Sequence, residues 1–186
     1  PKIDILLTDH FGKEHQAATI QLDFQLPQRF KLEYQNAEDS YDTPIMIHRA
    51  IFGSVERFMA LLIDHYAGKW PFWLSPRQAV VIPINDAHKD YAREVVKVLS
   101  NEPQDFEHAT KLSQSKFYVD LDDRNETIGF RTKEAIGKGY NFIILVGDKE
   151  IESGKLAIRP SYSRKIENLS VDDTRNKFKD LENNYH

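Results

Sequence analysis

The stretch from Pro44 to Arg57 reads PIMIHRAIFGSVER and does more than any other to decide the fold. Its apolar start predicts a short strand over residues 45–47, and Gly53 permits the turn that follows. Ser54 is a suitable N-cap for a helix over residues 54–66, because apolar residues recur there at helical spacing. They are Val55, Phe58, Met59, Leu62 and Ile63. The stretch therefore predicts a strand that ends at a histidine, followed by a helix whose first turn carries an arginine.

Upstream of this stretch the sequence predicts two strands, over residues 2–8 and 15–24, joined by a turn in which Gly12 supplies a permissive backbone. The second strand carries polar residues among apolar ones, and such a stripe lines a wet cleft or lies exposed. The stripe consists of Gln16, Thr19, Gln21 and Asp23. Residues 31–42 are polar and acidic and predict a loop. This first part is dominated by strands and is too small to be a whole domain.

Residues 67–76 break the pattern with one glycine and two prolines, and their two tryptophans and one phenylalanine predict a packed connector. From residue 77 onward strands and helices alternate, which is typical of an α/β domain with a mixed, largely parallel sheet. Strands are expected over residues 78–84, 116–121, 140–147 and 155–159, and helices over residues 87–99, 128–139 and 171–181. Residues 100–115 are polar and irregular and predict a mobile insertion. The fold class is thus α+β at the start of the chain and α/β after it.

Composition excludes several classes of protein. The 186 residues contain no cysteine, which excludes disulfides and any thiolate metal site built from this chain alone. The net charge is −4, so a nucleic-acid contact would require a local basic surface. No run approaches the roughly 18 consecutive apolar residues that span a bilayer, and no signal-peptide pattern opens the chain. Pro1 begins inside an alternating strand pattern without an initiator methionine, which predicts the cut end of a longer polypeptide.

Two residues of the opening stretch are candidates for chemistry, and each has an ordinary structural alternative. His48 could bind a metal at the end of the strand, but it lacks neighbours at ligand spacing, so the residues alone favour a structural histidine. Arg57 offers a flat fork of donors to a nucleotide phosphate or an adenine ring, at a helix N-terminus that favours anions. The alternative is a surface arginine paired with Glu56 or Asp64.

Residues 122–131 are a third candidate, because they follow a predicted strand at the edge where open α/β sheets bind ligands. They form either a ligand-binding loop or a capped turn with Asn125 or Thr127 as the N-cap of the next helix. The paired acidic residues Asp122 and Asp123 fit a solvated loop better than a metal site, because no third ligand stands at useful spacing.

Residues 148–159 read as a charged turn after the strand over residues 140–147, followed by a second strand that ends at Arg159. They form either a hairpin without a ligand or a surface that binds single-stranded RNA. As an RNA surface the segment offers the cations Lys149, Lys155 and Arg159 and the acceptor Glu150. Splayed bases would also need an aromatic partner, for which the candidates are Phe130, Tyr162 and Phe117, although Phe117 is expected in the core.

Six segments of the chain, in the same order, resemble the C-terminal part of threonyl-tRNA synthetases, a family of class II aminoacyl-tRNA synthetases. They are residues 1–4, 16–24, 46–58, 73–78, 120–130 and 146–150. The opening stretch resembles the third signature motif of the class, and the insertion and short tail are most similar to fungal mitochondrial forms. The resemblance implies that residues 1–66 are the end of an antiparallel class II catalytic sheet. Residues 67–76 would be a connector and residues 77–186 an anticodon-binding domain.

The resemblance also implies site residues, position by position. His48 corresponds to the last zinc ligand of the family, whose Zn²⁺ selects threonine through its amino and hydroxyl groups, and the other ligands are expected before Pro1. Arg57 corresponds to the motif arginine that contacts ATP, which binds with Mg²⁺. Gln16 and Thr19 correspond to neighbours of the nucleotide, and Gln21 and Ala50 to the threonine pocket.

In the second domain the resemblance assigns the reading of anticodon bases to Asn125, Glu150 and Arg159. Two positions depart from the family. Ala17 stands where many relatives have cysteine, so a contact by that thiol is absent. Thr127 replaces a common lysine, which would weaken or redirect a contact to the anticodon arm.

The implied function is ATP-dependent activation of threonine and its transfer to the cognate tRNA, which is bound at its anticodon stem-loop and its acceptor end. The resemblance further implies a homodimer formed through the catalytic domain, in the mitochondrial matrix or, alternatively, the cytoplasm, with no membrane partner. The 186-residue stretch alone is expected to be inactive, since the other class II motifs would precede it. The alternative function is a non-catalytic module that binds tRNA or another RNA.

Overall fold

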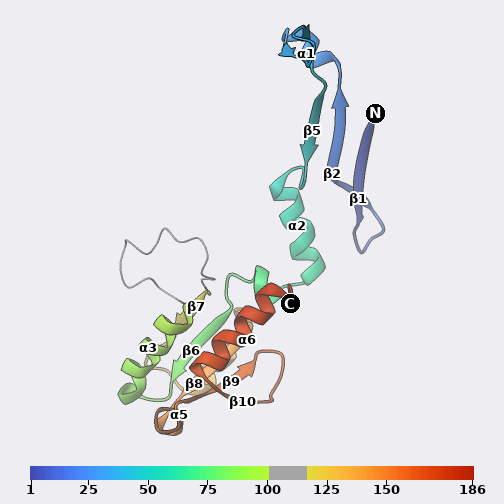
Figure 1. The fold of residues 1–186 in the computed structure, drawn as a ribbon. Helices are drawn as coiled ribbons and strands as arrows, with labels where there is room; N and C mark the ends of the chain where they lie inside the picture. Colours follow the sequence, from blue (N-terminus) through green and yellow to red (C-terminus); the bar gives the residue numbers. More distant parts are fainter. Residues whose placement is uncertain (101–116) are drawn as a thin grey trace. The chain divides into compact units, whose positions relative to one another are not determined.

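The computed structural model describes residues 1–100 and 117–186 and divides the chain into two compact units, Pro1–Gly68 and Lys69–His186 (Figure 1). The predicted insertion lies, apart from Ser100, outside the described residues. The segment predicted as a connector is shared between the units, and its Phe72 belongs to the core of the second.

The first unit is built on an antiparallel sheet of three strands, β1 (Lys2–Thr8), β2 (Glu14–Asp23) and β5 (Met46–Ala50), with β2 in the middle. The β1–β2 turn forms because Gly12 adopts a left-handed φ of 79° and the Asp9 carboxylate accepts the amides of Phe11 and Lys13. The two predicted strands and the turn that joins them are confirmed.

The segment between β2 and β5 contains more structure than the sequence predicts. Helix α1 (Gln25–Arg29) follows β2 directly, and the predicted loop over residues 31–42 contains a small antiparallel pair, β3 (Tyr34–Gln35) and β4 (Tyr41–Asp42). The prediction of a plain loop is therefore wrong. Strands of two residues give no alternating pattern, so local sequence carries no signal for them.

Helix α2 (Val55–Tyr66) follows β5 as predicted. Ser54 caps it by accepting the amide of Arg57 at 3.4 Å, and Ala67 ends it in the left-handed region with φ of 47°. In residues 1–68 only Ala17 and Pro27 are buried. This unit therefore has no closed hydrophobic core of its own.

The second unit is an α/β layer around a five-stranded mixed sheet (Figure 1). Its strands are β6 (Ala79–Pro83), β7 (Val119–Leu121), β8 (Phe142–Val146), β9 (Lys155–Pro160) and β10 (Glu167–Ser170), in the order β10-β9-β8-β6-β7. Strands β7, β6 and β8 are parallel, while β9 and β10 are added antiparallel. The mixed sheet is confirmed, and β10 is a strand that the sequence did not predict.

Helices cover both faces of this sheet. Helices α3 (Lys89–Ser100) and α6 (Val171–Asn183) pack on one face, where Phe178 contacts Phe72, Phe117 and Phe142 in the main core. Helix α4 (Ile128–Gly137) packs on the other face through Ala135. Two short 3₁₀ helices, η1 (Phe72–Leu74) and η2 (Asp86–His88), precede β6 and α3. In the described part of the chain no helix is long and apolar enough to cross a membrane.

The connection between β8 and β9 corrects one prediction. Residues 148–154, expected to be a charged turn, form helix α5 (Asp148–Ser153). The Glu150 carboxylate accepts the Gly147 amide at 2.9 Å at its start, and Gly154 ends it with φ of 64°. A helix of six residues is too short to show a 3.6-residue period, which is why charge alone suggested a turn.

Candidate functional site

The polar face of the first sheet gathers five of the residues assigned to the active site. Gln21 lies opposite His48 in the β2–β5 register, and Thr19 lies opposite Ala50. Directly opposed residues of an antiparallel pair project to the same face of the sheet, so these four share one face.

Gln16 reaches the same face through a β-bulge. Ile5 is paired with Ala18 but Leu6 is paired with Gln16, so Ala17 is the extra residue. Without it, strict alternation would place Gln16 on the face opposite to Thr19. The Gln16 amide instead donates to Asp4 at 2.7 Å, and Asp4 lies opposite Thr19. Ala17 is itself 7% exposed, so the bulge packs a small side chain inward.

Arg57 is anchored to this strand from the first turn of α2. Its Nη2 donates to the backbone carbonyl of Gln16 at 3.2 Å, so it contacts neither Glu56 nor Asp64, the partners expected for a plain surface arginine. Glu56 accepts from Ser54, and Asp64 bonds His10. The exposed guanidinium retains donors for a ligand, because an arginine carries five N–H groups.

Gly53 fixes the approach of α2 to β2. Its φ is 62°, and a Cβ placed there would lie 3.2 Å from the Ala17 carbonyl oxygen and 3.7 Å from Arg57 Nη2. The left-handed backbone conformation costs a residue that carries a Cβ about 1–2 kcal/mol. The glycine of the opening stretch is therefore required by backbone conformation and by the close contact with the bulge.

If Arg57 contacts ATP, as the resemblance implies, Gly53→Ala in the full-length protein should lower kcat/KM for ATP by about tenfold, since a loss of about 1.4 kcal/mol corresponds to that factor. Gly12→Ala is the matched control, because Gly12 has a similar φ of 79° but nothing within 4 Å of its added Cβ. Steady-state kinetics of both variants check this expectation. An equal loss in both would show that general strain, and not the position of Arg57, is responsible.

His48 has a partner that the sequence did not reveal. Its Nε2 lies 3.0 Å from Asp23 Oδ2, and the two side chains are 42% and 20% exposed. The Leu26 amide, together with His48 and the Gln25 amide, holds the pKa of Asp23 below its usual value, although partial burial opposes the shift. Asp23 is therefore a carboxylate at neutral pH.

In residues 1–100 and 117–186, no group of three histidine or acidic side chains could hold a metal ion. His48 still fits the part of a single ligand, because it is a half-exposed imidazole whose Nε2 is engaged by a carboxylate. This is the outer-shell arrangement common to metal-binding histidines. The described residues around His48 could thus supply a single donor to a metal ion.

The residues assigned to the anticodon separate into two places on the second unit. Asn125 follows β7 and Glu150 follows β8. Strand β6 lies between these two strands, and both run parallel to it. Both residues therefore lie at the carboxyl edge of the sheet, on strands about 10 Å apart. Arg159 is half-buried on the α4 face and pairs with Ile143, the second residue of β8, so it lies toward the other edge.

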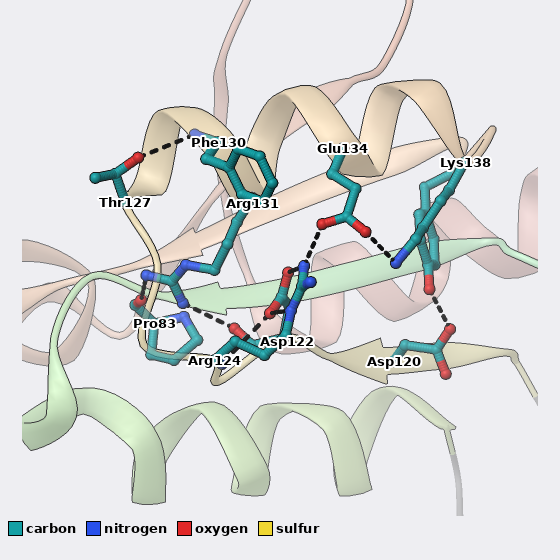
Figure 2. A network of polar contacts seen from close by, with 10 residues as sticks. Pro83, Asp120, Asp122, Arg124, Thr127, Phe130, Arg131, Glu134 and Lys138 are labelled. Carbon is teal, nitrogen blue, oxygen red and sulfur yellow. Dashed lines mark hydrogen bonds and ion pairs between the residues drawn. The ribbon is translucent and has the colours of Figure 1, made fainter.

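The loop that carries Asn125 is held by two arginines, of which Arg131 is buried and Arg124 exposed (Figure 2). Arg131 in α4 is 4% exposed and donates to the carbonyls of Asp122 at 2.8 Å and Pro83 at 2.9 Å. It thereby joins the ends of β6 and β7 to the helix that follows the loop. Thr127 caps that helix by accepting the Phe130 amide at 3.3 Å, which selects the second of the two N-caps considered.

Arg124 forms a second tie across the same loop (Figure 2). Its Nη2 contacts Asp122 at 2.8 Å and Glu134 at 2.6 Å, and Lys138 lies 2.7 Å from Glu134. The Arg124 guanidinium holds the pKa values of the Asp122 and Glu134 carboxyls below their usual range. Asp123, the other acidic residue of the pair, contacts Arg93 at 3.2 Å. Both Asp122 and Asp123 are therefore paired with an arginine.

Acidification should weaken this network. Both carboxyl pKa values are lowered in the folded state, so the stabilisation is complete above the unfolded values of about 4 and is lost as pH falls through the folded ones. We expect Arg124→Gln to lower the thermal midpoint of the second unit at pH 7, and we expect this difference to shrink as the pH falls below about 4. Midpoints measured by calorimetry over a series of pH values check this. A difference that does not shrink with acidification would contradict an ionic origin.

The three aromatic candidates for base stacking differ in their exposure. Phe117 is 1% exposed and belongs to the core, as expected, whereas Phe130 is 52% and Tyr162 86% exposed. Both exposed rings are free to stack on a base, although single exposed aromatics are common on protein surfaces.

Sequence reasoning missed the residues that hold the site residues in place. The sequence identifies Asp23 only as a polar residue of β2 and does not single out Arg131 or His88. His88 is buried, and its Nε2 lies 2.9 Å from Asp148 of α5. Asp23 directly before a break in the strand pattern is typical of a turn in which an aspartate accepts the backbone amides that follow it. Arg131 and His88 act across the fold, so no local pattern identifies them.

Comparisons with known proteins match both units. Residues 78–181 match the anticodon binding domain family, and residues 1–66 match the tRNA synthetase class II core domain of the G, H, P, S and T enzymes. The mitochondrial threonine–tRNA ligase of Saccharomyces cerevisiae is 51% identical over 190 residues, which cover 100% of this chain and 41% of that protein. A Dictyostelium discoideum protein named "Probable threonine–tRNA ligase 1, cytoplasmic" is 45% identical over 97% of this chain and 24% of its own length.

A solved structure has the same fold. The RNA binding domain of threonyl-tRNA synthetase from Cryptosporidium parvum Iowa II superimposes with a TM-score of 0.84 and 38% sequence identity, covering 97% of this chain and 43% of that one. The chain therefore spans less than half the length of the relatives that it matches.

Proposed function

Because the chain belongs to the threonyl-tRNA synthetases, with a class II core segment and an anticodon-binding domain, we propose that the full-length protein is a threonine–tRNA ligase. It activates threonine with ATP and Mg²⁺ to threonyl-adenylate and transfers the threonyl group to the cognate tRNA. The single observation that carries this proposal is the contact of Arg57 with the Gln16 carbonyl, at the edge of the face that bears Thr19, Gln21 and His48.

The arrangement of this face suits adenylate formation. Attack of the threonine carboxylate on the α-phosphate needs positioning and charge stabilisation more than a protein nucleophile. The Arg57 guanidinium supplies fixed positive charge for the nucleotide, and Gln16 and Thr19 supply hydrogen-bonding groups beside it. Gln21 and Ala50 line the place proposed for threonine. Ala50 leaves room there because its side chain is a single methyl group.

We further propose that His48 is one ligand of Zn²⁺, with the remaining ligands supplied by other parts of the full-length protein. When bound, the metal would hold threonine by its amino and hydroxyl groups and so distinguish it from valine. The half-exposed His48 and its carboxylate partner support this role, because the donor set fits one corner of a zinc site.

Partner surfaces of the first unit are also proposed. Its apolar sheet face contains a hollow of about 270 Å³ lined by residues such as Ile3, Ile5, Ile20 and Phe58. Large exposed apolar areas need cover, which supports further protein on this face, from the same class II core or from a second subunit of a homodimer. Light scattering of the full-length protein would test the dimer.

For the second unit we propose recognition of the threonine anticodon by Asn125, Glu150 and Arg159. The exposed Asn125 amide and the Glu150 carboxylate at one sheet edge offer donors and acceptors to splayed bases. Glu150 Oε2 already accepts the Gly147 amide, which fixes the carboxylate while its second oxygen can accept from a base. Arg159 contacts RNA at a separate point of the α4 face.

The compartment proposed is the mitochondrial matrix, supported by the similarity to the mitochondrial yeast enzyme. The cytoplasm is the alternative, because a cytoplasmic relative is nearly as similar. Fluorescence microscopy of the tagged full-length protein in its own cells separates the two.

Threonine-dependent ATP–pyrophosphate exchange by the full-length protein tests the proposed ligase directly. We expect exchange in the natural protein and a strong loss in His48→Ala and Arg57→Ala. Exchange that is unchanged in both variants would overturn the assignment of the site. The alternative, a non-catalytic RNA-binding module, would be supported by tRNA binding that depends on Arg159 in a protein without any exchange activity.

A further inference from the structure

Asp23 is the residue of the polar face to which no role has been given. It is the last residue of β2 and is separated from α1 by Phe24. Its Oδ1 accepts the amides of Gln25 at 2.9 Å and Leu26 at 3.0 Å, and its Oδ2 contacts His48 Nε2 at 3.0 Å. The side chain is only 20% exposed, so all three contacts form in a partly enclosed place.

These contacts determine which nitrogen of His48 carries the proton. An ionised carboxylate can only accept hydrogen bonds, so His48 Nε2 must be the donor. In a neutral imidazole the other nitrogen then keeps its lone pair. His48 Nδ1 is therefore the nitrogen able to bind a cation, and the ring cannot rotate without breaking the bond to Asp23.

We propose that Asp23 is a positioning residue that holds His48 as the Nε2–H tautomer and presents Nδ1 to the metal. The inference rests on the zinc ligand proposed above and adds the residue that makes it effective. A carboxylate behind a ligating histidine also raises the basicity of the ring, and loss of such a partner weakens metal binding about 10- to 100-fold.

The start of α1 makes the arrangement rigid. Since Oδ1 is held by two backbone amides, the Asp23 carboxylate cannot turn away from His48. The same two amides decide how an asparagine would sit at this position. As donors they can bond only the side-chain oxygen of the asparagine, which leaves its NH₂ group facing His48 Nε2.

Asp23→Asn is therefore the decisive variant. Its NH₂ group would donate to Nε2 and drive the proton to Nδ1, which removes the lone pair needed by the metal, while the amides of Gln25 and Leu26 keep an acceptor. We expect Zn²⁺ affinity in the full-length protein, measured by competition with a chelator, to fall about 10- to 100-fold. His48→Ala, which removes the ligand itself, should lower the affinity at least as much.

Asp9 provides a matched control within the same sheet. Its Oδ1 accepts the amides of Phe11 and Lys13, and its Oδ2 lies 2.7 Å from His15 Nε2, so it repeats the geometry of Asp23 at a different histidine. We expect Asp9→Asn to leave the Zn²⁺ affinity unchanged. An equal loss in both variants would attribute the effect to general disturbance of the sheet and overturn the inference.

A second measurement reports the tautomer directly. The ¹⁵N chemical shifts of His48 in the metal-free full-length protein should indicate Nε2–H in the natural protein and Nδ1–H in Asp23→Asn. A merely structural role of Asp23 would leave this signature unchanged.

The outcomes separate this inference from the proposed function. If the natural protein binds Zn²⁺ and Asp23→Asn binds it equally well, the inference is overturned while the zinc ligand stands. If the natural protein binds no Zn²⁺, both are overturned. Threonine-dependent exchange in the same preparation then shows whether the ligase assignment survives without the metal.

Discussion

Arg57→Ala in the full-length protein should lower kcat/KM for threonine-dependent ATP–pyrophosphate exchange by about 10²- to 10³-fold, the usual loss when one charge-stabilising donor is removed. The guanidinium is already held beside β2 by the Gln16 carbonyl, so little ordering is needed when the nucleotide binds. Steady-state exchange kinetics at saturating threonine measure the effect.

Arg57→Lys is the informative companion variant. It keeps the charge but loses the planar fork, so we expect it to recover only part of the rate. Circular dichroism should show unchanged folding, because the Arg57 side chain is exposed and its guanidinium bonds a backbone carbonyl of β2. Activity within about threefold of the natural protein in Arg57→Ala would place the nucleotide elsewhere, since about 0.6 kcal/mol cannot represent a phosphate contact.

Arg131→Met should have the largest effect on stability, about 3 kcal/mol, because it leaves two buried carbonyl oxygens without their charged donor. These are the carbonyls of Pro83 and Asp122 at the ends of β6 and β7. Methionine roughly preserves the volume, so the loss reports on the hydrogen bonds more than on a cavity. Hydrogen exchange at the amides of β6, β7 and α4 measures the local free energy of opening.

Arg124→Met is the matched control for this prediction. Arg124 serves the same loop, but its side chain is 46% exposed and forms its ion pairs in contact with water. We expect its loss to cost much less than that of Arg131, because water and salt screen exposed ion pairs. If the two variants were equally stable, Arg131 could not be the residue that holds the Asn125 loop.

The sequence predicts the order of the elements well where the signal is local. Ser54 and Gly53 identify the start of α2, and the alternation of strands and helices after residue 77 identifies the mixed sheet. Capping also depends only on nearby residues, so the sequence narrows the N-cap of α4 to Asn125 or Thr127, and Thr127 is the one observed.

Prediction fails where position depends on tertiary contacts. The bulge at Ala17 changes the face of Gln16, and no residue type announces it. Strand β10 and helix α5 are short and stabilised by their neighbours in the sheet and by Glu150, so their local patterns are weak. The pairing of His48 with Asp23 joins residues 25 positions apart and required the β2–β5 register to be known.

Attachment of threonine to tRNA by the full-length protein tests the central proposal most directly. With ATP, Mg²⁺ and tRNA that carries a threonine anticodon, we predict threonyl-tRNA formation that is lost in Arg57→Ala and is weakened by a changed anticodon. Valine should not be attached, because it lacks the hydroxyl group that the proposed metal recognises. Tight binding of this tRNA without any attachment of threonine would contradict the ligase and support the RNA-binding module instead.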